Sequence, residues 1–198
     1  MPSYLVNLRM PLSPGPVLLS VKEHLIMRGA KNGKRHHVMV TYGYAKDEQK
    51  RPIVSQMGLI KSFLDGTPSI ELWVDSKLAG LCALEVSRDN PEDADPEDEA
   101  PGVHYRASLR AVVIRKSKRR MGFAHYLSTA AAGLFSSQIL SFMSEDGLKA
   151  CTVAVQAVFL SKEGERFYFD MTDKVQNNFS VCEKILGKKV KMVFDAGS

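Results

Sequence analysis

The chain is poor in the residues that build disulfide frameworks and metal sites. It has three cysteines, Cys82, Cys151 and Cys182, and none forms a CxxC pair or stands at metal-ligand spacing from a histidine. Each lies in an apolar or helical pattern, which is typical of buried thiols in a reducing compartment. We therefore expect a cytoplasmic protein with no disulfide framework and no metal site.

Targeting and membrane segments are also missing from the pattern. The N-terminal residues lack a basic start followed by an apolar core, and three prolines interrupt them, so no signal peptide is expected. Gly122–Met143 is nearly uncharged and follows a basic flank, but its serine, threonine and glutamine side chains make it less apolar than a membrane span. We expect a buried, alanine-rich helix there and no membrane partner.

Charge is distributed unevenly along the 198 residues, which suit a single domain, 1–198. Of the 22 acidic residues, seven lie between Asp89 and Glu99, so 15 remain to face 27 lysines and arginines elsewhere. A basic body favours polyanionic partners, either a nucleotide cofactor or nucleic acid. We interpret residues 88–102 as a mobile acidic insertion, which would be a solubilising loop, a lure for a cationic substrate or a lid over the basic face.

The first half of the chain shows alternating helical and strand patterns. Apolar spacing and a following glycine predict a helix over Val17–Met27. Further along we expect a basic turn at Lys31–His37, a strand at Val38–Tyr44, a polar loop at Asp47–Arg51, a helix at Ile53–Leu64 that begins beside Pro52, and a β-hairpin of Ser69–Asp75 with Leu78–Val86. His36 and His37 are adjacent, so in a strand they would point to opposite faces and would not share a metal.

The clearest candidate for a ligand-binding site is a strand that is followed by a basic turn and then by a helix. The strand is expected at Tyr105–Ile114, the turn at Arg115–Arg120 and the helix at Phe123–Met143, with a buried strand, Ala150–Val158, after it. The first backbone N–H groups of a helix have no partners inside it and attract phosphate. Gly122 would let such a ligand approach the backbone closely.

The segment Arg119-x-x-Gly122-x-Ala124, preceded by Val112-Val113-Ile114, resembles the acyl-CoA-binding motif of the GNAT N-acyltransferase superfamily. The resemblance implies an α/β (α+β) fold with a mixed, mostly antiparallel central sheet flanked by helices, in which the strands at Tyr105–Ile114 and Ala150–Val158 splay apart around the pantetheine arm. It also implies acetyl-CoA, or another acyl-CoA, as the cofactor. The residues that it assigns to the cofactor are Val112, Val113, Ile114, Lys118, Arg119, Arg120, Met121, Gly122, Phe123 and Ala124.

The C-terminal part fits the family pattern in two ways. The family usually has a helix with an aromatic pair, then a glycine and a final strand. Val181–Gly187 followed by a strand at Lys189–Phe194 has the better order, although it puts Cys182 where a tyrosine is common. Phe167 and Tyr168 supply the aromatic pair in the competing alignment. We prefer the first, which leaves Phe167–Asp170 in an added strand or loop.

Acyl transfer to an amine needs an oxyanion donor, a base for the amine and an acid for the leaving thiolate. The resemblance places the oxyanion donor on a backbone N–H near Val112–Ile114. A base would project from the same strand at Ser108 or Arg110, and neither side chain suits the role. His104 and Glu85 are the nearest titratable candidates, and Tyr168 is the aromatic candidate for protonating the thiolate. His125 is expected to pack or cap.

These observations favour an acyl-CoA-dependent N-acyltransferase that works by direct attack in a ternary complex with an amine of a small molecule, protein or nucleic acid. The alternatives are a non-catalytic nucleic-acid-binding protein, which would use Lys31–His37 and Arg115–Arg120, and an interaction module on a degenerate acyltransferase fold. A homodimer is a further option.

Overall fold

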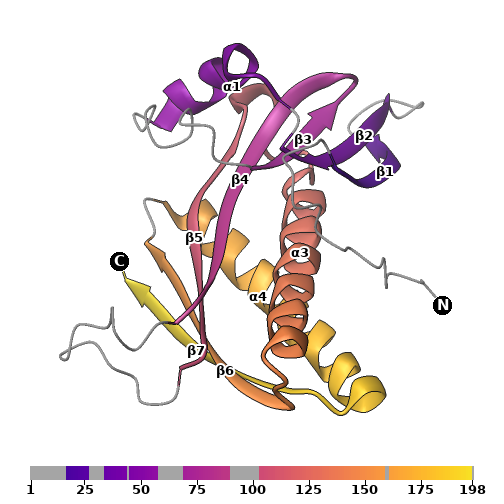
Figure 1. Cartoon of the computed structure of the whole chain (residues 1–198). Coiled ribbons are helices and arrows are strands. Elements are labelled where there is room, and N and C mark those ends of the chain that lie inside the picture. The colour runs from indigo at the N-terminus through magenta and orange to yellow at the C-terminus, as the bar shows by residue number, and fades with distance from the viewer. Residues whose placement is uncertain are drawn as a thin grey trace.

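The fold is one mixed β-sheet with helices on both faces (Figure 1). The structure, a computed structural model, describes residues 17–26, 34–43, 45–57, 69–89, 103–158 and 161–197. In these ranges seven strands form the sheet in chain order: β1 (Val17–Ile26), β2 (Lys34–Tyr42), β3 (Ile70–Val74), β4 (Lys77–Arg88), β5 (Tyr105–Ile114), β6 (Ala150–Val158) and β7 (Lys189–Gly197). Neighbours from β1 to β5 are antiparallel, whereas β5–β6 and β6–β7 are parallel. The expected α/β class, with a mixed and mostly antiparallel sheet flanked by helices, is confirmed.

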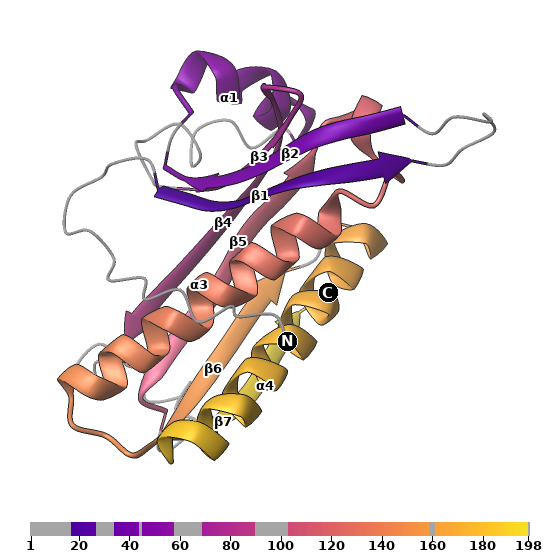
Figure 2. The same ribbon diagram turned by 90° about the vertical axis from the view of Figure 1, so that its right-hand side faces the viewer.

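The helices divide between the two faces. They are α1 (Asp47–Val54), α3 (Ala124–Glu145) and α4 (Lys162–Leu186), with short 3₁₀ turns η1 (Ser55–Met57) and η2 (Lys116–Lys118). The long helices α3 and α4 lie side by side on one face (Figure 2), where Leu127, Phe135 and Tyr168 belong to the main core. On the opposite face α1 packs Ile53 into a smaller core with Trp73. Removing such large apolar side chains from water stabilises the fold by about 1.5–3 kcal/mol each.

The expected helix at Val17–Met27 is wrong, because Val17–Ile26 forms strand β1 and residue 27 lies outside the described ranges. The strand pairs with β2 along its length, from Val17 opposite Tyr42 to Ile26 opposite Lys34. A segment rich in apolar and β-branched residues can match the apolar repeat of a helix or of a strand. Here pairing with β2 favours the strand. The basic turn expected at Lys31–His37 is also partly wrong, since β2 begins at Lys34; residues 31–33 lie outside the described ranges.

The polar loop expected at Asp47–Arg51 is instead most of helix α1. Asp47 and Glu48 place negative charge at the positive end of this helix, and Gln49 Oε1 accepts a hydrogen bond from the Lys46 amide at 3.1 Å. Pro52 therefore lies inside the helix and does not start it. The expected helix at Ile53–Leu64 is described only as far as residue 57.

Helix α4 combines the two C-terminal stretches that competed in the sequence. Ser161 caps its start by accepting a hydrogen bond from the Gly164 amide at 3.1 Å, and Gly187 ends it with a φ of 64°. The expected order of helix, glycine and strand is confirmed. Phe167–Asp170, expected as a strand or loop, is helical instead, because the buried side chains of Phe167, Met171 and Val175 continue at helical spacing.

Other expected elements are confirmed. Strands β3 and β4 form the hairpin, with left-handed φ values of 51° and 62° at Asp75 and Ser76 in its turn. The bounds of β5 and β6 agree with the prediction, and α3 extends two residues beyond Met143. Of the acidic insertion only residues 88 and 89 lie in the described ranges. In those ranges no helix has the length and hydropathy needed to cross a membrane.

Candidate anion-binding turn between strand β5 and helix α3

The chain between Ile114 and Ala124 is a compact turn held at both ends. The Arg115 amide donates to the carbonyl of Ala79 at 2.8 Å, which fixes the turn to β4. The guanidinium Nε of Arg119 donates to the carbonyl of Ile114, also at 2.8 Å. Arg120 and Gly122 have φ values of 59° and 81°, and such a left-handed conformation is uncommon for an arginine. These contacts and dihedrals turn the chain sharply from the strand into the helix.

Helix α3 begins without a side-chain cap. Phe123 occupies the cap position and makes no side-chain capping hydrogen bond, in contrast to Ser161 at the start of α4. The amides of Gly122 and Ala124 donate no hydrogen bond within the part of the chain that the structure describes. Because the dipole of a 22-residue helix adds positive potential there, these amides suit an anion.

Full positive charges surround this helix start. Lys118 is partly buried, whereas Arg119 and Arg120 are exposed, and the first turn of α3 contains no acidic residue. The predicted cofactor segment is therefore basic at its surface. Its apolar members are more enclosed: Val113 and Phe123 are buried, and Val112 and Met121 pack against the main core.

Strand β5 extends beyond the part that pairs with β6. Its pairing with β6 runs only from Tyr105 opposite Val153 to Leu109 opposite Ala157. Residues 110–114 continue beside β4 alone, after a β-bulge between Leu109 and Ala111, and Figure 1 shows β5 running on past the end of β6. In the described ranges this half of β5 thus has one unpaired edge next to the basic turn. Bulges of this kind are common beside functional sites.

A histidine–aspartate pair that sequence reasoning missed lies beside the same turn. His36 is buried, with 2% of its side chain exposed, and its Nδ1 lies 2.6 Å from Oδ2 of Asp75. Among the residues that the structure describes, its Nε2 has no hydrogen-bond partner. The Lys118 ammonium is 4.0 Å from the same Asp75 oxygen.

This pair connects three separate segments. The His36 ring meets the Phe123 ring edge-on, with centroids 5.7 Å apart, and the Asp75 carboxylate also accepts from the His37 amide at 3.1 Å. The hydrogen bond from His36 is the main cause that lowers the pKa of Asp75 below its ordinary value. The start of β2, the β3–β4 turn and the basic turn therefore meet at one carboxylate. The sequence places Asp75 in the hairpin turn, but it does not indicate that His36 is the partner of this carboxylate.

The two basic stretches proposed for nucleic acid come together here, but not as one free cationic surface. His36 is buried and paired with the Asp75 carboxylate, and His37 points to the other face of β2, as expected for adjacent strand residues. The side chains of Arg35, Arg119 and Arg120 are exposed.

The three predicted catalytic residues do not meet at one place on the sheet. Glu85 is exposed on β4, opposite Ser108, and its carboxylate bonds to Arg110 Nε at 2.9 Å. It lies near the point where β5 leaves β6. His104 lies just before β5, at the paired end of these strands, where its ring Nδ1 and the Thr152 amide are 3.2 Å apart. The length of β5 separates it from the basic turn.

Tyr168 is fully buried between α4 and the sheet. Its hydroxyl donates to the carbonyl of Val155 on β6 at 3.2 Å, and its ring contacts Phe169 and Phe194. Cys182, which takes the tyrosine position in the preferred alignment, is buried near the C-terminal end of the same helix. His125, in the first turn of α3, is exposed. The structure therefore does not gather His104, Glu85 and Tyr168 into one cluster.

The described residues contain no group of three or more histidine, cysteine and acidic side chains that could hold a metal ion. Comparison with protein families, curated proteins and solved structures found no match to this chain.

Proposed function

We propose that the protein is an acyl-CoA-dependent N-acyltransferase, with acetyl-CoA as its first expected donor. The observation that carries the proposal is the uncapped start of α3 beside the half of β5 that leaves β6. The amides of Gly122 and Ala124 would take the diphosphate, with charge from Lys118 and Arg119 around it. The resemblance of Arg119-x-x-Gly122-x-Ala124 to the GNAT motif supports the same assignment.

The open edge of β5 is the proposed place for the thioester. The amine nitrogen would attack the thioester carbonyl carbon, the C–S bond would break, and coenzyme A would leave as a thiolate that takes up a proton. A backbone N–H within residues 110–114 would stabilise the oxyanion, because that edge has no strand partner in the described ranges. Reaction in a ternary complex needs no covalent enzyme intermediate.

Glu85 is the best placed of the predicted bases for this step. Its carboxylate is exposed and lies beside the bulge, where β5 parts from β6. Arg110 Nε donates a hydrogen bond to this carboxylate at 2.9 Å, which holds the side chain in place beside the strand. His104 and Tyr168 would need to act from the paired end of the strands and from the core, respectively, so we assign neither a direct role. The buried thiols fit a reducing compartment such as the cytoplasm.

A binding protein without catalysis is the second candidate, favoured by one observation. The exposed cations Arg119 and Arg120 belong to a turn that lacks an acidic residue of its own, which would also suit a nucleic-acid backbone. In that case binding would depend steeply on salt and would not require the thioester.

Titration calorimetry with acetyl-CoA separates these proposals. We expect a one-to-one complex, and Gly122→Asp should abolish it by placing a carboxylate where the diphosphate would lie. Gly147→Asp is the matched control, because Gly147 also has a left-handed φ, 68°, at the opposite end of α3 with open space around it. Equal loss in both variants, or no binding by the unaltered protein, would reject the acyl-CoA site; salt-dependent binding of a random duplex instead would favour the second candidate.

A further inference from the structure

Strand β7 forms an edge of the sheet. It pairs with β6 from Lys189 to Gly197, and no other described strand lies on its second side. An exposed edge with unpaired N–H and C=O groups is a template for pairing with another chain. Lysines at 189 and 191 are the kind of residue that usually blocks such pairing, so an acceptable partner must compensate for their charge.

The sequence of β7 supplies this compensation when the strand pairs antiparallel with a second copy of itself. If the twofold axis passes through Val193, Lys191 of one copy stands opposite Asp195 of the other, and symmetry repeats the pair. Directly opposite residues share a face of the sheet, so Met192 lies opposite Phe194 on the other face. Moving the axis by one residue places Lys191 opposite Val193 and loses this match. The central register is therefore self-complementary in both charge and hydrophobicity.

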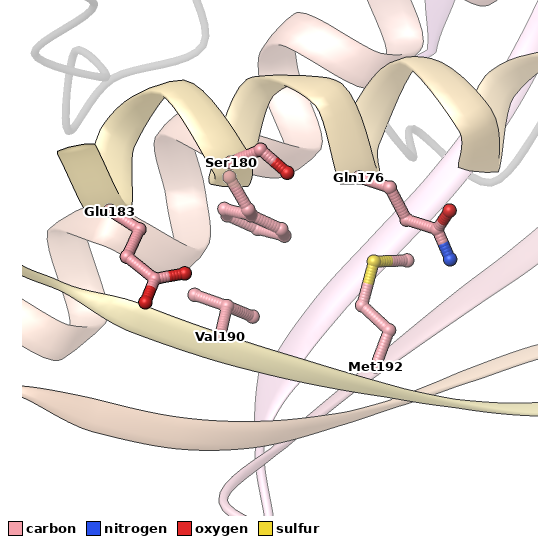
Figure 3. A pocket seen from close by; sticks show the side chains of 6 residues that line it. Gln176, Ser180, Glu183, Val190 and Met192 are labelled. Atoms are coloured by element: carbon pink, nitrogen blue, oxygen red, sulfur yellow. The ribbon is translucent and has the colours of Figure 1, made fainter.

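A groove at the same edge offers room for the second copy. It has a volume of about 260 Å³ and lies between α4 and β7, where Gln176, Ser180 and Glu183 face Val190 and Met192 (Figure 3). Phe194 points to this face, since its ring is near Tyr168 of α4, yet it is 44% exposed. In the central register Phe194 of the second copy would stand beside Met192 at the lining of the groove.

Helix α4 borders the groove along one side, with Gln176, Ser180 and Glu183 at its lining. Because antiparallel pairing keeps the helix-covered faces on one side, both α4 helices would flank the joint. A pair of nine-residue strands alone is small for a stable interface, and the groove-lining side chains of both α4 helices would extend it.

We propose that the protein forms a twofold dimer through antiparallel pairing of β7 with β7, centred on Val193, with Phe194 of each copy at the α4–β7 groove of the other. This inference concerns a surface separate from the α3 turn and does not depend on the acyltransferase proposal. Binding of acetyl-CoA and dimer formation can therefore succeed or fail independently.

Analytical ultracentrifugation across the micromolar concentration range measures the monomer–dimer equilibrium and tests the β7–β7 register centred on Val193. The unaltered protein should be a dimer. Lys191→Glu should weaken the dimer at least about tenfold, because both symmetric pairs become repulsive. The double variant Lys191→Glu/Asp195→Lys should restore it, since the opposite charges are then exchanged. Lys77→Glu is the control for net charge; Lys77 is exposed at the start of β4, which β5 and β6 separate from β7.

A second measurement covers the case in which the charge variants fold poorly. Val193→Cys should give a covalent dimer with a short bismaleimide, because the two residues at position 193 would be opposite each other. The three native cysteines are buried, so the unaltered protein should not cross-link. A monomer in sedimentation, a dimer that tolerates Lys191→Glu, or failure of Val193→Cys to cross-link would each overturn the proposal.

Discussion

Replacing Asp75 by asparagine should separate two effects of this carboxylate, one on stability and one on anion binding. Asparagine tolerates the left-handed φ of 51° at this position, so the turn itself should survive. The change removes the negative charge that faces His36 and Lys118 and leaves an amide oxygen in its place.

The cost to stability follows from the His36 hydrogen bond. A charge-assisted hydrogen bond contributes roughly 1.5–3 kcal/mol and a neutral one roughly 0.5–1.5 kcal/mol, so the exchange should lower the free energy of unfolding by about 1 kcal/mol. Asp75→Ala should cost more, about 1–3 kcal/mol, because the buried imidazole then loses its acceptor.

The effect on an anion at the basic turn has the opposite sign. Unit charges 4.0 Å apart attract by about 1 kcal/mol in water, and Asp75 is 44% exposed, so screening makes this an upper limit. Releasing Lys118 from that attraction should tighten binding of coenzyme A by up to about fivefold.

Urea unfolding and calorimetry with coenzyme A measure the two effects separately. Since the pKa of Asp75 is lowered in the folded state, its stabilising contribution is present above the pKa of the unfolded carboxyl and is lost as the pH falls through the folded value. The asparagine variant should lack this part of the acid dependence. Asp173→Asn, an exposed change on α4, controls for net charge. A variant as stable as the unaltered protein at neutral pH would refute the role assigned to the His36–Asp75 pair.

Three further outcomes are expected. Tyr168→Phe should lower the free energy of unfolding by about 0.5–1.5 kcal/mol, because the buried hydrogen bond to the Val155 carbonyl is lost, and should leave acyl transfer intact; a selective loss of kcat would reinstate Tyr168 as the acid. Burial raises the pKa of Cys82 to about 12, so a thiol reagent should modify this residue only after urea unfolding, and rapid labelling of the native protein would contradict its burial. The hydrogen bond from Arg88 lowers the pKa of Asp146, so its contribution to stability is lost as the pH falls below about 4, and Asp146→Asn should flatten that decline in acid unfolding curves.

The sequence predicts elements well where one signal dominates. The β-branched run at Val112–Ile114 and the uncharged alanine-rich stretch after Gly122 allowed only one assignment each, and β5 and α3 are confirmed. Gly187 likewise marks the end of α4 by its left-handed φ. In these places local conformational preference and tertiary packing agree.

The sequence-based predictions fail where residues distant in the sequence determine the local structure. Val17–Met27 has helical spacing, but pairing with β2 makes it a strand. The His36–Asp75 pair joins residues 39 positions apart, and no local pattern connects them. Conversely, the sequence predicts Glu85, His104 and Tyr168 from residue type alone, which carries no information on their separation along the strands.

The agreement between strand order and chain order has a consequence for how this protein is made. Each strand that leaves the ribosome would find its predecessor already in place, so the sheet can grow by successive addition from the N-terminal hairpins. The steps into β6 and β7 are slower, since each must wait for a long helix to cross over before a parallel neighbour can dock. The edge strand β7 would therefore be the last of the described strands to join the sheet.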